Sequence, residues 1–352
     1  MKIFEHGGNI YSVDGQAENF LDMSANINPF GLSESVKAAI INNIDGLIHY
    51  PDPSACELKT AIASRYRINF ENIIVLNGAA EFFYLFFNVI RPKKVLIVAP
   101  SFSEYERSAL AANCEIKFFL TSEQDNFNIN FDKLTASLKS EKFNCIVLAS
   151  PNNPTGNLIA AENILKLQSL VDYVMLDESF IDFIGDEKSD RYLVNDMKNL
   201  IVVQSLTKFF ALPGLRLGFA IAEESLIKKF ELAKDVWNVN YLAQKAGVTA
   251  LNDNEYICKS RSWIAEEKFY IIDRLKKISR IKFFKPTVNF VLLKFESDQI
   301  AMNLIENFRE KKILLRSCKN FRGLDGRFIR MAIRSRIENE RVLNLIENFG
   351  GD

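Results

Sequence analysis

The chain has 352 residues, of which 48% are hydrophobic and 25% are charged, and its formal net charge at pH 7 is zero. This composition is ordinary for a soluble globular protein, and the length suits two sub-domains around a sizeable core. The balanced charge excludes a global electrostatic field that would recruit nucleic acid or an anionic membrane.

The cysteine and histidine content narrows the class further. The five cysteines lie far apart and form no Cys-x-x-Cys pair, which is typical of free thiols in a reducing cytoplasm. With only two histidines, a histidine-based metal centre is not expected. No apolar run has signal-peptide character at the N-terminus or approaches the roughly 20 residues of a spanning helix. We therefore expect a cytoplasmic protein without a metal ion.

The N-terminal half predicts an arm and then a layered α/β unit. Residues 1–45 read as an arm and a first helix, which pack with the C-terminal part. After these, short apolar runs alternate with helical patterns, which indicates a buried and largely parallel sheet between helices. The expected strands are IIVLNG, KVLIVAP, EIKFFL, FNCIVLAS, YVMLDES, LIVVQS and LGFAIAE.

The C-terminal part predicts a smaller α+β unit. Long helices are expected from about Glu223 to about Arg280. They are followed by strand NFVLLKF, a helix, strands ILLRS and RFIRMAI, and a last helix. The predicted fold class is α/β, with a large domain that holds a mostly parallel mixed sheet and a smaller α+β C-terminal domain. We place the large domain at 46–235 and the linking helices and small domain at 236–352.

Polar residues follow three of the expected strands, at the ends where open α/β sheets bind ligands. Asn153 lies in PNNPTG after FNCIVLAS, Asp177 ends YVMLD, and Ser205 and Lys208 lie in SLTK after LIVVQ. Singly, each has an ordinary explanation: a lysine amine that reaches solvent, a helix cap, or a turn. Their convergence at one edge of a sheet is what predicts a site.

Together these residue types predict a site for pyridoxal 5′-phosphate (PLP). A lysine amine in a semi-apolar pocket has a lowered pKa and forms a Schiff base with an aldehyde. A nearby aspartate suits a protonated pyridine nitrogen. A helix N-terminus opened by Gly78, Ala79 and Ala80 offers backbone N–H groups to a phosphate, to which Ser205 and Arg216 add a hydroxyl and a guanidinium.

With these motifs the chain resembles, over essentially its whole length, the fold-type I PLP enzymes of the class I and II aminotransferase family. The resemblance implies that Lys208 holds the cofactor, Asp177 pairs with its ring nitrogen and Asn153 donates to its phenolic oxygen. Phe102 is implied to stack on the ring. Tyr50, in HYPDP, is implied to reach the cofactor phosphate of a neighbouring subunit in a homodimer with shared sites. The other implied cofactor ligands are Gly78, Ala79, Ala80, Ser205 and Arg216.

One position departs from the family pattern. Family members commonly carry a tyrosine three residues after the aspartate, where this chain has Phe180. The hydrogen bond from that tyrosine to the phenolic oxygen is therefore absent, which departs from simple transaminase electronics. Phenylalanine is also an ordinary core residue.

The terminal stretches narrow the resemblance. HGGN and DMSANINP near the N-terminus, and CKNFRGL and RMAIR near the C-terminus, are similar to L-threonine-O-3-phosphate decarboxylases, a family of cobalamin side-chain synthesis. This implies decarboxylation of L-threonine O-3-phosphate to (R)-1-aminopropan-2-yl phosphate. Histidinol-phosphate aminotransferases share YPDP and NPTG. The alternative is therefore an aminotransferase of that type, or one for another amino acid, which uses 2-oxoglutarate and glutamate.

A basic cluster favours a doubly anionic substrate. Residues 316–336 contain seven basic residues and one acid. Strand alternation over residues 328–334 places Arg330 and Arg334 on one face, although such a cluster is also typical of a solvated face or a weak nucleic-acid patch. By resemblance Arg330 binds the substrate carboxylate. The expected substrate-binding residues are Arg330, Arg334, Arg322, His6 and Asn28.

Decarboxylation and transamination share one cofactor site. They differ in which substrate bond, Cα–carboxylate or Cα–H, stands perpendicular to the cofactor ring, and Lys208 is the expected proton donor or acceptor in either case. The sequence does not show this angle, so decarboxylation rests on the resemblance. A PLP-binding transcriptional sensor is a third alternative, but such proteins carry a DNA-binding domain for which we expect no room here.

Overall fold

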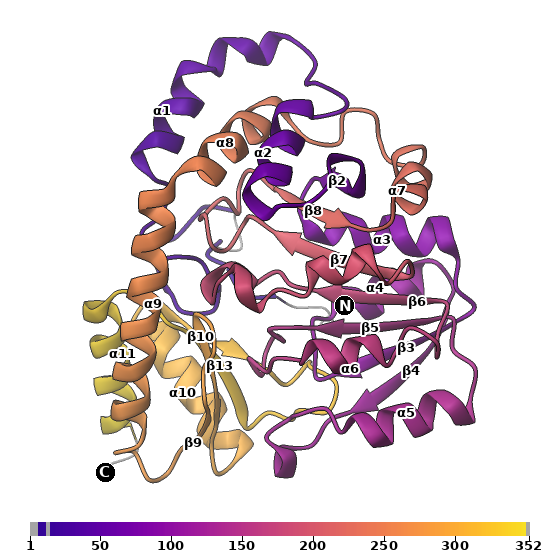
Figure 1. The fold of residues 1–352 in the computed structure, drawn as a ribbon. Coiled ribbons are helices and arrows are strands. Elements are labelled where there is room, and N and C mark those ends of the chain that lie inside the picture. The colour runs from indigo at the N-terminus through magenta and orange to yellow at the C-terminus, as the bar shows by residue number, and fades with distance from the viewer. Residues whose placement is uncertain (1–5, 12–14, 350–352) are drawn as a thin grey trace.

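The computed structural model describes residues 6–11 and 15–349. Residues 1–5 and 12–14 of the predicted arm, and residues 350–352 at the other end, lie outside the described part. Within it the chain forms a seven-stranded, a four-stranded and a two-stranded sheet. The two larger sheets lie beside each other, the larger one at the right of Figure 1 and the smaller one at the lower left. None of the described helices has the length and apolarity that a membrane span requires.

The larger sheet consists of the seven runs that the sequence predicted as strands. Its order is β2-β8-β7-β6-β5-β3-β4, and all neighbours are parallel except the two pairs that β8 makes. The mostly parallel mixed sheet that the sequence predicted is thus confirmed. The strands are β2 (Ile73–Leu76), β3 (Lys94–Ala99), β4 (Glu115–Leu120), β5 (Cys145–Ala149), β6 (Tyr173–Asp177), β7 (Leu200–Ser205) and β8 (Gly218–Ile221).

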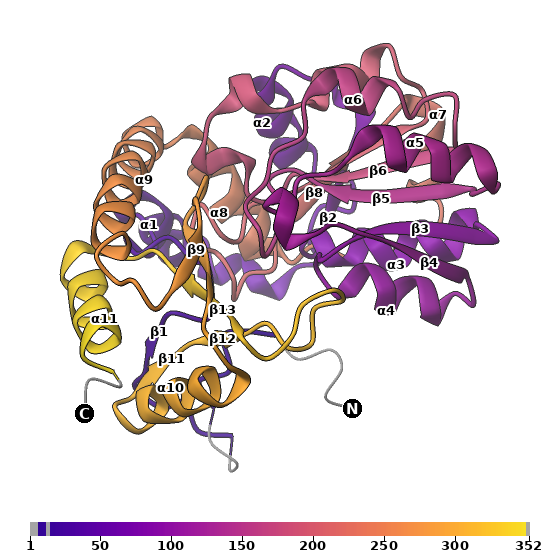
Figure 2. The ribbon, with the colours of Figure 1, turned by 90° about the horizontal axis from the view of Figure 1, so that it is seen from below.

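Side chains of this sheet alternate between two faces, and each face has its own apolar core. Val147 and Met175 pack in one core, and Leu148 and Leu176 pack in the other. Helices cover both faces, as Figure 2 shows for α3 and α4 against α5 and α6. The first face carries α3 (Ala79–Ile90), α4 (Glu104–Ala111) and α7 (Glu224–Glu231), and the second carries α2 (Cys56–Tyr66), α5 (Phe131–Ser140) and α6 (Ala161–Leu165).

The smaller sheet is antiparallel and has the order β12-β13-β10-β9. Three of its strands lie in predicted runs, whereas β9 was not predicted because its three residues show no clear alternation. The strands are β9 (Lys282–Phe284), β10 (Phe290–Lys294), β12 (Arg316–Ser317) and β13 (Phe328–Ala332). The accompanying helices are α8 (Tyr241–Asn252), α9 (Asn254–Leu275), α10 (Asp298–Glu310) and α11 (Arg336–Asn348).

The N-terminal segment joins the smaller sheet region. β1 (Leu21–Asp22) pairs in parallel with β11 (Ile313–Leu314), and the Met23 carbonyl accepts a hydrogen bond from Ala332 N at 2.8 Å. α1 (Glu34–Asn42) then starts at the N-cap Ser33 and packs on α8. Residues 21–23 therefore lie against strands that follow them by about 300 positions in the sequence. The boundaries at residues 45 and 235 stay predictions.

A buried polar network on the second face ties β6 to β7. The Glu178 carboxylate accepts hydrogen bonds from Gln204 Nε2 at 2.8 Å, from Asp190 N at 2.7 Å and from the Ser189 hydroxyl. Burial raises the pKa of Glu178 to about 7, against the hydrogen bonds and the charge of Arg191, which lower it. The network holds the ends of β6 and β7 in place on the second face of the sheet. The residues that precede or follow Glu178 and Gln204 in the sequence point to the first face.

Candidate active site

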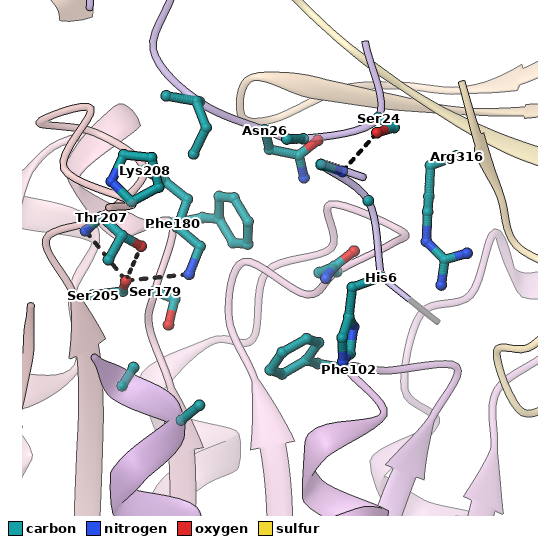
Figure 3. Close-up of a pocket in the computed structure, with 18 of the residues that line it drawn as sticks. His6, Ser24, Asn26, Phe102, Ser179, Phe180, Ser205, Thr207, Lys208 and Arg316 are labelled. Atoms are coloured by element: carbon teal, nitrogen blue, oxygen red, sulfur yellow. Dashed lines mark hydrogen bonds between the residues drawn. The ribbon is translucent and has the colours of Figure 1, made fainter. Parts of the chain in front are cut away.

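A cavity of about 590 Å³ opens where the carboxyl ends of β5, β6 and β7 face the N-terminal segment and the smaller sheet (Figure 3). Parallel strands end at the same edge, which is why residues distant in the sequence meet here. From the larger sheet the cavity is lined by Ala79, Ala80, Phe102, Asn153, Asp177, Phe180, Ser205, Thr207, Lys208 and Arg216. From the other side it is lined by His6, Asp22, Ser24, Asn26, Arg316 and Arg330.

Lys208 directs its amine into this cavity. Its Nζ lies 3.1 Å from Ser205 Oγ, a contact that Figure 3 draws as a dashed line. The pKa of Lys208 is lowered to about 8, chiefly by burial, with the charges of Arg216 and Arg330 acting in the same direction. The Asp177 charge opposes this shift. Near pH 8 the amine is therefore available as a nucleophile, as the sequence analysis expected.

Asp177 ends β6 and is 6% exposed. Its Oδ2 accepts a hydrogen bond from the Tyr105 hydroxyl at 2.5 Å, and its Oδ1 accepts one from Ser179 N at 2.7 Å. A carboxylate has about four lone-pair sites, so it can still accept from a group in the cavity. Strand alternation directs Asp177 to the α4 side, opposite Glu178.

The N-terminus of α3 forms a cradle with Arg216. Gly78 has φ +83°, and a Cβ on it would lie 2.4 Å from Arg216 Nη2. A Cβ on Gly218 would lie 2.5 Å from Ala79 N. Both positions therefore need glycine so that a guanidinium and a strand can approach the first turn of α3. Backbone N–H groups and a guanidinium at a helix N-terminus suit a phosphate.

Ser205 contributes a hydroxyl beside this cradle. Its Oγ lies 2.7 Å from Thr207 Oγ1, and both side chains line the cavity. Thr207 was not among the site residues expected from the sequence, although it lies between Ser205 and Lys208 in the motif SLTK. A lysine amine, a carboxylate and a phosphate cradle thus share one cavity, and this set of side chains fits PLP.

Arg330 reaches the cavity from β13. Its Nη1 donates to Asn153 Oδ1 at 2.6 Å, and its Nη2 donates to the Ser24 carbonyl at 2.5 Å. Burial lowers its pKa to about 10. Arg330 Nε and Asn26 Oδ1 are buried, and neither has a hydrogen-bond partner among residues 6–11 and 15–349. A buried polar atom without a partner is uncommon in a native structure.

Arg316, which the sequence analysis did not select, lies in the same cavity wall. It is 7% exposed, and its Nη2 donates to Asn320 Oδ1 at 2.7 Å. In the register of β12 and β13, Arg316 stands directly opposite Arg330. The run ILLRS was predicted as a strand, so the signal was present, but the pairing of the two arginines depends on a register that the sequence does not show.

The chain is similar to known proteins over nearly its whole length. The family model for aminotransferase class I and II matches residues 18–349. The chain belongs to this family. The resemblance that the sequence motifs indicated is thus confirmed at the level of the family.

Individual members of the family are similar over nearly the full chain. A Caldanaerobacter subterraneus subsp. tengcongensis protein, provisionally named a threonine-phosphate decarboxylase, is 41% identical over 100% of this chain and 94% of its own. The threonine-phosphate decarboxylase of Salmonella typhimurium is 35% identical over 97% of this chain and 96% of its own. The crystal structure of the histidinol-phosphate aminotransferase from Clostridium acetobutylicum gives a TM-score of 0.86 at 32% identity, covering 93% of this chain and 99% of that one.

Two aromatic residues and a histidine complete the walls of the aminotransferase-family site. Phe180 is 6% exposed, packs edge-on against Phe290 and lies 5.8 Å from Lys208 Nζ. The rings of Phe102 and His6 lie 5.3 Å apart, and His6 Nε2 lies 2.8 Å from Glu104 Oε1. The roles that resemblance implies for Phe102 and His6 stay predictions.

Two arginines expected at the substrate lie outside the cavity lining. Arg322 forms a two-point ion pair with Glu106 in the first turn of α4, at 2.5 and 3.1 Å. Arg334 lies beyond the end of β13 at Ala332, so strand alternation no longer applies to it. Its Nε donates to Glu338 Oε1 at 3.1 Å. The predicted strand over residues 328–334 therefore ends at Ala332, and Arg334 does not line the cavity with Arg330.

Asn28 also lies outside the cavity lining, behind the lysine loop. Its backbone N donates to the Lys208 carbonyl at 3.0 Å. Its Nδ2 donates to the Phe209 carbonyl at 2.9 Å and to Ser260 Oγ at 2.7 Å. In the structure it anchors the loop, and its neighbour Asn26 faces the cavity instead.

We expect Lys208 to react with amine-directed acylating reagents with a midpoint near pH 8, against about 10.4 for ordinary lysines. Below this pH the amine is protonated and unreactive. Asp177→Asn should lower the midpoint further, because the carboxylate favours the charged amine. Peptide mass spectrometry after short labelling pulses measures this, with the surface lysines as internal controls. A Lys208 midpoint equal to that of the surface lysines would contradict the lowered pKa of this amine.

Proposed function

We propose that this chain is a PLP-dependent lyase that decarboxylates L-threonine O-3-phosphate to (R)-1-aminopropan-2-yl phosphate in cobalamin biosynthesis. The observation that carries the proposal is the pair of buried arginines in the cavity of Lys208. Similarity to two proteins named as threonine-phosphate decarboxylases supports the reaction type. The alternative is an aminotransferase of the histidinol-phosphate type, which similarity to that structure supports.

The arginine pair argues for a substrate with two anionic groups. Like charges directly opposite each other on neighbouring strands destabilise a sheet. The charge of Arg316 accordingly adds to the burial that lowers the pKa of Arg330. An anionic ligand relieves this repulsion, and a phosphorylated amino acid brings both a carboxylate and a phosphate. In the proposal Arg330 binds the carboxylate, while Arg316, Asn26 and His6 bind the phosphate.

The cofactor is PLP, held by the residues of the larger sheet. The cradle of Ala79, Ala80, Ser205 and Arg216 would hold its phosphate, and Lys208 would hold its aldehyde. Asp177 would hold a proton on the ring nitrogen. Bound in this way, PLP supplies a ring that accepts the electron pair released when a bond at the substrate α-carbon breaks.

The residues of this chain select the bond and move the proton. Arg330 and Arg316 grip the two ends of the substrate, so that its orientation relative to Lys208 is set by the chain. As CO₂ leaves, Lys208 in its ammonium form donates a proton to the substrate α-carbon. Phe180 leaves an apolar wall beside this amine and contributes no hydroxyl. Burial of the amine keeps its pKa close to neutral, which suits both uptake and release of a proton.

The functional unit of the proposal is a cytoplasmic homodimer with shared sites. Tyr50 is 75% exposed, stacks on Trp237 with ring centres 4.1 Å apart, and does not line the cavity of its own chain. Other exposed apolar side chains lie within ten sequence positions of Tyr50 or Trp237, and exposed apolar residues in such number are typical of an interaction surface. They are Ile41, Ile44, Leu47, Ile48 and Val236. In the dimer Tyr50 reaches the cofactor phosphate of the partner.

Purified protein with PLP should release CO₂ from O-phospho-L-threonine without added 2-oxoglutarate. Radiolabelled carboxyl carbon measures the release, and Lys208→Ala is the inactive control because it removes the only amine that we place at the cofactor aldehyde. If the protein instead consumed the substrate only when 2-oxoglutarate was present, and formed glutamate, the aminotransferase would be supported. Absence of both reactions from a chain that retains PLP would exclude this substrate.

Arg316→Gln should raise the KM for the phosphorylated substrate about tenfold or more, because a charge-assisted hydrogen bond to an anion is lost. Steady-state kinetics measures this. Arg334→Gln is the comparison, since Arg334 pairs with Glu338 outside the cavity. If KM rose in the variant at position 334 and not in the variant at position 316, the substrate phosphate would be bound by Arg334, as the sequence suggested, and not by Arg316.

Mixing Lys208→Ala chains with Tyr50→Phe chains should restore activity that neither variant has alone. A mixed dimer contains one site that combines an intact Lys208 with an intact Tyr50 from the partner. The chains are mixed in mild denaturant, refolded and assayed, with each variant refolded alone as the control. If mixed dimers form but remain as inactive as the separate variants, Tyr50 does not act across the interface.

A further inference from the structure

The hydroxyl of Tyr105 is buried directly beneath the Asp177 carboxylate. Tyr105 is the second residue of α4 and is 1% exposed. Its hydroxyl donates to Asp177 Oδ2 at 2.5 Å, a short bond of the kind that a charged acceptor favours. Neither the motifs nor the resemblance of the sequence selected this residue.

The ring of Tyr105 is held in place on both sides. It packs edge-on against Phe83, with ring centres 4.9 Å apart, and against Phe102, with ring centres 5.8 Å apart. Both phenylalanines line the cavity. The hydroxyl therefore has a fixed position, and a rigid donor loses little conformational freedom when it bonds the carboxylate.

Tyr105 keeps its proton under working conditions. Burial raises its pKa well above the usual range, and the negative charge of Asp177 raises it further. The phenol is therefore a permanent donor, and the carboxylate is the acceptor. Ser179 N donates a second hydrogen bond to the Asp177 carboxylate, at 2.7 Å, so both carboxylate oxygens are held in place.

We propose that Tyr105 is a positioning residue, whose hydroxyl holds the Asp177 carboxylate in its orientation toward the cavity, so that Asp177 can hold the ring-nitrogen proton of PLP. This inference rests on the proposed function, because it names the partner of Asp177. It goes beyond that function because it assigns a role to a residue within α4. Phe102, the residue expected to stack on the cofactor ring, lies in the loop before this helix. A carboxylate turned away from the cavity could not pair with a pyridinium.

Tyr105→Phe removes the hydroxyl and keeps the ring. We expect the dissociation constant for PLP to rise about tenfold, since a hydrogen bond to a charged group is lost. The ring-nitrogen resonance of nitrogen-15-labelled PLP, measured by NMR on the bound cofactor, should move toward that of a neutral pyridine. Tyr173→Phe, at the opposite end of β6 from Asp177, is the matched control and should leave both readouts unchanged.

The double variant with Asp177→Asn separates positioning from mere packing. If Tyr105 acts through the carboxylate, Tyr105→Phe adds little to the loss that Asp177→Asn causes alone. An equal loss in both backgrounds overturns the inference, as does an unchanged nitrogen resonance in the single variant. Replacement of Tyr105 by 3-fluorotyrosine, a stronger acid with almost the same shape, should shift the resonance the opposite way and guards against a folding defect in Tyr105→Phe. If the unsubstituted chain takes up no PLP, the proposed function itself fails.

Discussion

The burial of positive charge around one cavity is the constraint on which the rest of the site depends. Lys208 is partly buried at the carboxyl edge of the larger sheet, Arg330 is buried in β13 of the smaller sheet, and burial lowers the pKa of each. A buried cation is costly unless anions or dipoles compensate it. The Asp177 charge favours the charged form of Lys208, and the Asp177 carboxylate accepts a hydrogen bond from Tyr105 of α4.

Because side chains alternate along a strand, the residues at this edge point to two different faces of the sheet. Asp177 and Ser205 face the α4 side and the cavity, whereas Glu178 and Gln204 turn to the opposite face and bond each other at 2.8 Å. The second pair aligns the ends of β6 and β7 from behind. Catalytic geometry and structural support are thus built from consecutive residues of the same two strands.

The smaller sheet contributes two buried cations to the cavity. Arg316 and Arg330 face each other across β12 and β13, an arrangement that costs stability when no anion is present. The N-terminal segment closes over them, because the Ser24 carbonyl accepts from Arg330 and β1 pairs with β11. In the proposed function, a substrate with two anionic groups would relieve this repulsion.

The sequence alone determined the larger sheet and its catalytic edge. Apolar runs of strand length specify buried strands, and parallel strands end at one edge, so Asp177 and Lys208 had to meet once the strands formed. Tertiary structure decided the rest. Arg334 turned to Glu338 because β13 ends before it, and Arg316 faces Arg330 because of a strand register. Tyr105 reaches Asp177 because a helix packs there. Such contacts join residues far apart in the chain, and their geometry follows from packing and register, which no local pattern encodes.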